Sequence, residues 1–103
     1  MPRTFVRAEL EFADAEKPFS MAMSELGFVQ TVTGRISRKS LRLPSGMYLI
    51  EGTNPVEALE LTRQAARRAN VRARIFCVPV SGDIRFGNLK ADGRAARADH
   101  RTT

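Results

Sequence analysis

Residues 53–57, Thr-Asn-Pro-Val-Glu, constrain the fold more than any other stretch, because they fix where one helix begins. Asn54 is a favoured N-cap residue, and Pro55 suits the first helical position. Glu57 stands three residues after Asn54, which is the spacing of a capping box. The apolar residues that follow have helical spacing, so we predict a helix that runs from Pro55 to about Asn70.

The sequence on either side of this helix has the patterns of strands and of one more helix. Residues 5–12 alternate between apolar and polar side chains, as in a half-buried strand. Residues 14–27 have helical spacing, with Asp14 as the expected cap and Gly27 as the stop. Residues 73–80 are almost continuously apolar, which predicts a central strand covered on much of both faces. Pro79 near its end indicates that pairing stops there or meets an edge. Two further strands are expected at residues 28–33 and 47–51. The order β-α-β-β-α-β predicts an α+β fold, a ferredoxin-like sandwich.

The end of the chain differs in composition from the rest. Residues 84–86 would form a short fifth strand, and residues 91–103 are polar, basic and without apolar period. We therefore expect a ferredoxin-like domain over residues 1–90 and a basic disordered tail over residues 91–103. A chain of 103 residues with 43% hydrophobic content suits one small domain. The expected sheet face carrying Arg7 and Glu9 is mixed in character, and we expect it to be buried in a homodimer.

The location of the protein follows from what its apolar residues and its cysteine permit. Cys77 is the single cysteine, so the chain forms no internal disulfide and a reducing compartment is expected. No apolar run reaches the roughly 18 residues of a membrane span. Strand-like alternation begins near the N-terminus, where a signal peptide would show a longer apolar run. We expect a soluble, cytoplasmic protein with no membrane contact.

A basic segment at residues 34–42 is the clearest functional signal. It has four cations and no carboxylate, and the whole chain has 17 Lys and Arg against 11 Asp and Glu. Such a surface attracts RNA, DNA or an acidic protein. Arg63 and Arg67 on the predicted second helix would extend it. We therefore expect a small non-enzymatic regulatory or binding protein that acts on nucleic acid, or on a protein that handles nucleic acid, through a basic hairpin. The contact residues in the hairpin would be Arg35, Arg38, Lys39 and Arg42.

Three short stretches carry a resemblance to known proteins: Leu-Gly-Phe at residues 26–28, Met-Tyr-Leu-Ile-Glu at 47–51 and Asn-Pro-Val-Glu-Ala-Leu at 54–59. Together with the element order, they resemble a group of very small ferredoxin-like proteins over roughly residues 4–89. The group includes the CRISPR-associated adaptation protein of the dimeric ferredoxin-like type and the endoribonuclease antitoxins of type V toxin–antitoxin systems. The resemblance implies homodimers that bind or cleave nucleic acid. It also implies a strand after the fourth, here residues 84–89, that extends or exchanges sheets between subunits.

Two other functions stay open at this point. The first is a metal-dependent nuclease or endoribonuclease: the adaptation-protein branch has an Asp near the end of strand one, and here only Glu11 or Asp14 would stand in for it. Such an enzyme would need Mg²⁺ held by converging oxygen ligands. The second is an inhibitor of the phage-encoded type, whose basic segment would bind an acidic protein surface. The residues contain no complete catalytic or metal-ligand signature, so we expect no cofactor unless the chain is a nuclease.

Overall fold

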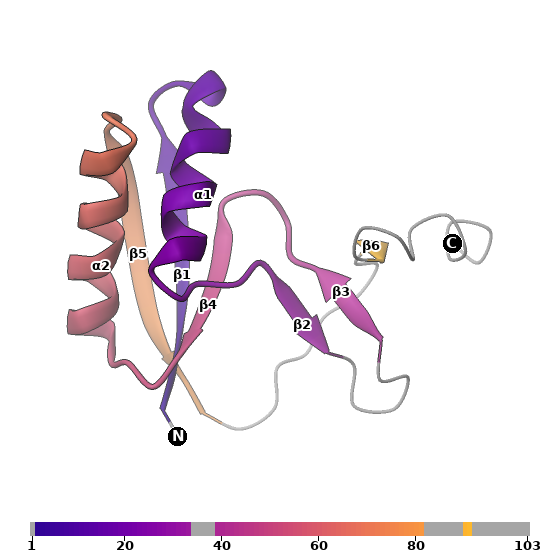
Figure 1. Ribbon diagram of the computed structural model, residues 1–103. Coiled ribbons are helices and arrows are strands. Elements are labelled where there is room, and N and C mark those ends of the chain that lie inside the picture. The colour runs from indigo at the N-terminus through magenta and orange to yellow at the C-terminus, as the bar shows by residue number, and fades with distance from the viewer. Residues whose placement is uncertain (1, 34–38, 82–89, 92–103) are drawn as a thin grey trace.

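The computed structural model describes residues 2–33, 39–81 and 90–91 of the chain (Figure 1). In this part the protein has a mixed α+β fold with two α-helices, one short 3₁₀ helix and two β-sheets. The elements in chain order are β1 (Arg3–Leu10), η1 (Ala13–Ala15), α1 (Glu16–Glu25), β2 (Thr31–Thr33), β3 (Ser40–Arg42), β4 (Met47–Glu51), α2 (Pro55–Arg68), β5 (Ala73–Val80) and β6 (Lys90–Ala91).

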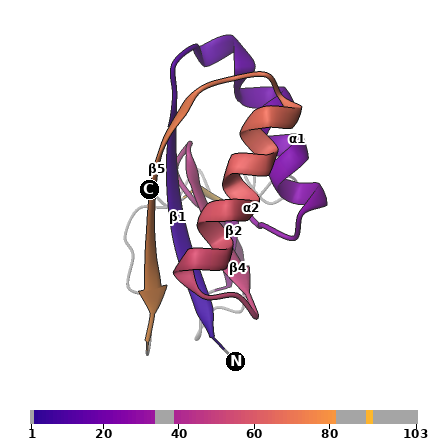
Figure 2. The ribbon, with the colours of Figure 1, turned by 90° about the vertical axis from the view of Figure 1, so that its left-hand side faces the viewer.

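The main sheet has the strand order β4-β1-β5, and both pairings are antiparallel. Its register places Phe5 opposite Leu49 on one side and opposite Val78 on the other. Helices α1 and α2 lie side by side on one face of this sheet, as the two views in Figures 1 and 2 show. The alternation predicted for the first strand is confirmed, because Val6 and Ala8 are buried under the helices while Arg7 and Glu9 are exposed.

Tyr48 lies at the centre of the core between the helices and the sheet. Its ring makes edge-on contacts with Phe19 and Phe28, at centroid distances of 6.0 and 6.3 Å. Such T-shaped pairs add to the stabilisation that apolar burial provides. Two threonines are also fully buried, and each donates a hydrogen bond of 2.8 Å to a backbone carbonyl: Thr4 to Thr53, and Thr62 to Ala58. These bonds offset the desolvation of the buried hydroxyls.

The second sheet has the strand order β2-β3-β6 and lies beyond β4 (Figure 1). It is joined to the main sheet by a bridge between Val29 and Leu49, whose backbones exchange two hydrogen bonds of 2.8 Å. A small apolar cluster supports this junction on the sheet face that points away from the helices. Its buried members are Val32, Leu43 and Leu49, and its half-buried members include Phe5, Leu41 and Met47.

The capping box predicted for the second helix is confirmed. The backbone N–H of Glu57 donates to Asn54 Oδ1 at 2.8 Å, and the N–H of Asn54 donates to Glu57 Oε1 at 3.2 Å. The cap predicted for the first helix is wrong, because Asp14 lies within η1 and α1 begins after Ala15 without a side-chain cap. The helix-packing residues of α1 are nevertheless apolar and buried at helical spacing.

The position predicted for the strand at residues 73–80 is also wrong. Among the described residues, β5 pairs with β1 alone and forms the outer strand of the main sheet. Its side chains are half-buried except for Arg74, Phe76 and Pro79, and Phe76 is 63% exposed. The sequence pattern indicated cover on both faces, whereas an antiparallel sheet with helices on one face leaves side chains of the other face accessible to solvent.

The structure tests only part of what the sequence predicts for the end of the first strand and for the C-terminal part of the chain. Strand β1 ends at Leu10, so Phe12 is exposed and does not continue the buried face. The fifth strand expected at residues 84–86 and the exchanging segment at residues 84–89 lie outside the described residues. Strand β6 spans the boundary expected between domain and tail. Neither α-helix in the described part of the chain has the length and apolarity that a membrane crossing requires.

Candidate anion-binding surface

Alternation in the second sheet separates an apolar face from a polar one. The register pairs Val32 with Leu41, and both side chains belong to the apolar cluster beside the main sheet. The neighbouring residues of each strand point to the opposite side, because successive side chains of a strand alternate. That opposite side is here named the hydroxyl-arginine face, and its described members are Thr31, Thr33, Ser40 and Arg42.

The hydroxyl-arginine face has the chemistry of an anion-binding surface. Arg42 ends β3 and is exposed, and it stands in register between Thr31 of β2 and Lys90 of β6. The described members of the face supply hydroxyl and guanidinium donors and no carboxylate. Lys39 comes directly before β3 and is also exposed. Arg35 and Arg38, the other two predicted contact residues of the hairpin, lie outside the described residues.

The register of β6 adds a basic residue that the sequence reading did not select. Lys90 follows Arg42 by 48 positions and was expected only to end the domain. The pairing of β3 with β6 sets it opposite Arg42. The pairing therefore brings a second basic position of the sequence into register with Arg42.

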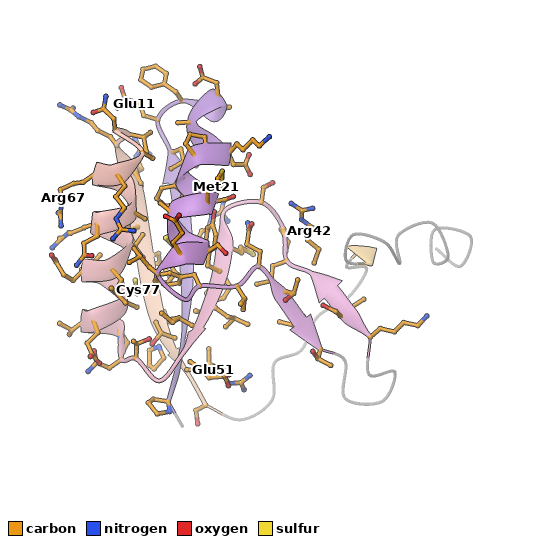
Figure 3. The ribbon with its side chains drawn as sticks, in the orientation of Figure 1. Glu11, Met21, Arg42, Glu51, Arg67 and Cys77 are labelled. Carbon is orange, nitrogen blue, oxygen red and sulfur yellow. The ribbon has the colours of Figure 1, made fainter. Side chains whose placement is uncertain are left out.

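Arg63 and Arg67, the predicted extension of the basic surface, lie elsewhere on the molecule. Both are exposed on α2, and both approach the Glu60 carboxylate, at 4.0 and 3.5 Å. Figure 3 places Arg67 and Arg42 on opposite sides of the protein. Arg67 therefore does not lie beside Arg42, and a partner contact through Arg63 and Arg67 stays a prediction. Exposed ion pairs of this kind stabilise a helix by at most about 1 kcal/mol.

The two carboxylates considered for a metal site do not gather with others. Glu11 follows the end of β1, where its backbone N–H donates to the Arg72 carbonyl at 3.0 Å, and Asp14 lies in η1. Over residues 2–33, 39–81 and 90–91, no three His, Cys, Asp or Glu side chains come together in a way that could hold a metal ion. Glu11 lines one hollow with Arg67 and Arg72, whose positive charges oppose a cation, and another with Glu9, Glu16 and Arg7.

Tyr48 and Cys77 are the titratable groups that burial perturbs most clearly. The pKa of Tyr48 is raised from 10.0 to about 12, mainly by burial and also by the nearby charge of Glu16, while a hydrogen bond with Ser20 acts in the opposite direction. Burial also raises the pKa of the Cys77 thiol. A thiol with a raised pKa keeps its proton near neutral pH and is a poor nucleophile. Both groups therefore belong to the packing of the domain.

Comparison of the chain with protein-family models, with curated proteins and with solved structures found no match. The resemblance to small ferredoxin-like nucleic-acid proteins therefore stays a prediction from the sequence pattern.

Proposed function

We propose that this protein is a small non-enzymatic binding protein that contacts the phosphate backbone of nucleic acid through the hydroxyl-arginine face of its second sheet. The observation that carries the proposal is the register Thr31–Arg42–Lys90, which aligns a hydroxyl and two basic residues across three strands. Of the four cations in the basic segment of the sequence, Arg42 lies in β3 and Lys39 directly precedes this strand.

The donors on this face fit phosphate better than they fit a base. A guanidinium can donate two parallel hydrogen bonds to one phosphate, and Ser and Thr hydroxyls are frequent donors to the nucleic-acid backbone. Base recognition by stacking needs an exposed aromatic ring, and the described members of the hydroxyl-arginine face include none. We therefore propose binding that depends strongly on salt and weakly on base sequence.

The proposed fold is the ferredoxin-like arrangement. The order β4-β1-β5 supplies three of its strands, and the bridge from Val29 to Leu49 supports the addition of residues 28–33 beside β4. This gives the order β5-β1-β4-β2, with both helices on one face.

A salt titration of binding to single-stranded RNA, single-stranded DNA and duplex DNA tests the proposal. The logarithm of the binding constant falls with the logarithm of salt by about 0.9 for each neutralised phosphate of duplex DNA, and by about 0.7 for single strands. The variants Arg42→Gln and Lys90→Gln should each reduce this slope by up to one phosphate contact. Arg63→Gln is the matched control, because Arg63 is an exposed arginine of α2, which lies on the other side of the molecule from β2 and β3 (Figure 1).

The outcomes separate the proposal from its alternatives. Equal slopes for Arg42→Gln and Arg63→Gln would remove the second sheet as the contact surface. Mg²⁺-dependent products on a gel, lost in Glu11→Gln or Asp14→Asn, would establish the nuclease instead. Absence of binding at low salt, together with a stoichiometric acidic protein that co-purifies, would establish an inhibitor that binds an acidic surface.

A further inference from the structure

We infer that the outer edge of β5 pairs antiparallel with β5 of a second copy of this chain, with Phe76 on the two-fold axis. The inference goes beyond the proposed nucleic-acid contact and does not depend on it, because it uses the opposite edge of the main sheet. The argument rests on the backbone groups of β5, on the side chains beside it and on its charge distribution.

The hydrogen bonds around β1 show which backbone groups of β5 point away from β1, toward the side where no other strand of the described residues pairs. The N–H of Glu11 donates to the carbonyl of Arg72, and these two residues continue the β1–β5 register. The N–H of Ala8 instead donates to Gly46 on the β4 side, so successive residues of β1 bond to opposite neighbours. By the same alternation, the even-numbered residues of β5 bond to β1. The residues that direct their backbone groups outward are Ala73, Ile75, Cys77 and Pro79.

Side chains beside this edge expose apolar area. Phe76, in the middle of β5, lies on the face away from the helices and is 63% exposed. Val56 is 78% exposed on α2, the helix that packs on β5, and Figure 2 shows α2 and β5 adjacent on the near side of the molecule. A long apolar strand with an open edge is a site at which other strands pair. Pairing with a second copy would cover the Phe76 ring.

The charges along β5 make its edge self-complementary in the antiparallel direction only. Arg72 and Arg74 lie at its N-terminal end, whereas residues 78–81 carry no charge. Antiparallel pairing sets the charged end of one copy against the uncharged end of the other. Parallel pairing would align Arg74 with the partner's Arg74, and like charges in register destabilise a sheet.

The exposed ring of Phe76 selects the register, and Pro79 limits how far the pairing extends. Proline has no N–H, so Pro79 cannot donate a hydrogen bond to a partner strand. Pairing Ile75 with the partner's Cys77 uses both N–H groups of each pair, whereas Pro79 opposite Ala73 of the partner subunit only accepts a hydrogen bond, so the full ladder ends there. In this register, Phe76 faces the partner's Phe76 in a pair that is not hydrogen-bonded. Cα atoms of such pairs lie about 4.5 Å apart, which is the closest approach for side chains in a sheet.

Light scattering without nucleic acid tests the pairing. The wild-type protein should have twice the 11.5 kDa mass of one chain at micromolar concentration. Phe76→Arg sets two like charges on the axis and should raise the dimer dissociation constant at least tenfold. Met21→Arg is the matched control, because Met21 is 59% exposed on α1 and should leave the dimer intact. A monomeric wild type, or a Phe76→Arg protein as dimeric as the control, would overturn the inference.

Disulfide trapping tests the register independently of any loss of folding. In a Cys77→Ser background, Phe76→Cys should give a covalent dimer when diamide oxidises the two thiols, since the expected Cα separation lies in the disulfide range. Arg74→Cys in the same background should remain unlinked. Position 74 lies two residues from the axis in each copy, so the two cysteines would be roughly 13 Å apart along the strands. Cross-linking of the Arg74→Cys protein but not of the Phe76→Cys protein would refute the register.

Discussion

Gly46 lies directly against the backbone of β1 at Ala8, and we expect its replacement by alanine to destabilise the domain strongly. It precedes β4 and has a φ of +82°. Its carbonyl accepts a hydrogen bond of 2.8 Å from the N–H of Ala8. A Cβ atom at this position would lie 2.7 Å from the Ala8 carbonyl oxygen, so backbone atoms rather than a flexible side chain would have to move.

The magnitude follows from two effects. The left-handed conformation costs a residue with a Cβ about 1–2 kcal/mol. Separation of the strands to relieve the close contact would weaken the Ala8–Gly46 hydrogen bond, whose net value is about 1 kcal/mol. We expect Gly46→Ala to lower the free energy of unfolding by about 2–4 kcal/mol, a large part of the 5–15 kcal/mol typical of a domain.

Gly52 provides a control that isolates the close contact. Its φ is +80°, almost the same as that of Gly46, but a Cβ there would meet no atom within 4 Å. Gly52→Ala should therefore lose only the conformational part, about 1–2 kcal/mol. Urea unfolding followed by circular dichroism measures both variants. Equal losses of stability in the two would refute the reasoning, because they would mean that β1 and β4 yield to the added methyl group without loss.

Two further predictions concern pH and helix capping. Below pH 10 the Tyr48 hydroxyl is protonated in both the folded and the unfolded state. Between pH 10 and 12 only the unfolded chain loses this proton. The free energy of unfolding should therefore fall by about 3 kcal/mol between pH 10 and 12. Urea unfolding of Tyr48→Phe should lack this part of the pH dependence, and identical profiles would contradict the assignment. Asn54→Ala should lower stability by about 1 kcal/mol and Asn54→Asp by much less, because aspartate also caps; thermal unfolding at neutral pH distinguishes them.

The elements that could be predicted are those whose signals are local. The cap of α2 needs only Asn54 and Glu57, and the buried face of β1 needs only the alternation of its own residues. The role of Lys90 could not be predicted in this way, because its place beside Arg42 depends on a pairing between distant strands. The separation of Arg67 from Arg42 is equally non-local, since both lie in basic stretches of the sequence and only the packing places them apart.

Strand β5 is the most informative difference between sequence and structure. Its apolar run predicts a central strand, yet within the described residues it has a neighbour on one side only. The two observations agree if the chain pairs with a second copy, because β5 then becomes central in a sheet of order β4-β1-β5-β5-β1-β4. The sequence pattern would reflect the assembled protein, and the edge position would be a property of the isolated chain.

This arrangement also separates the two proposed surfaces. The second sheet joins the main sheet at β4, on the other side of β1 from β5 (Figure 1). A dimer formed through β5 would therefore carry its two hydroxyl-arginine faces at the outer ends of the joined sheet, away from the axis. Substitutions at Arg42 would then alter phosphate contact without altering the dimer. Loss of the dimer would weaken binding only to a polyanion long enough to contact both hydroxyl-arginine faces at once. On such a polyanion the contact with the second face is intramolecular once the first face has bound.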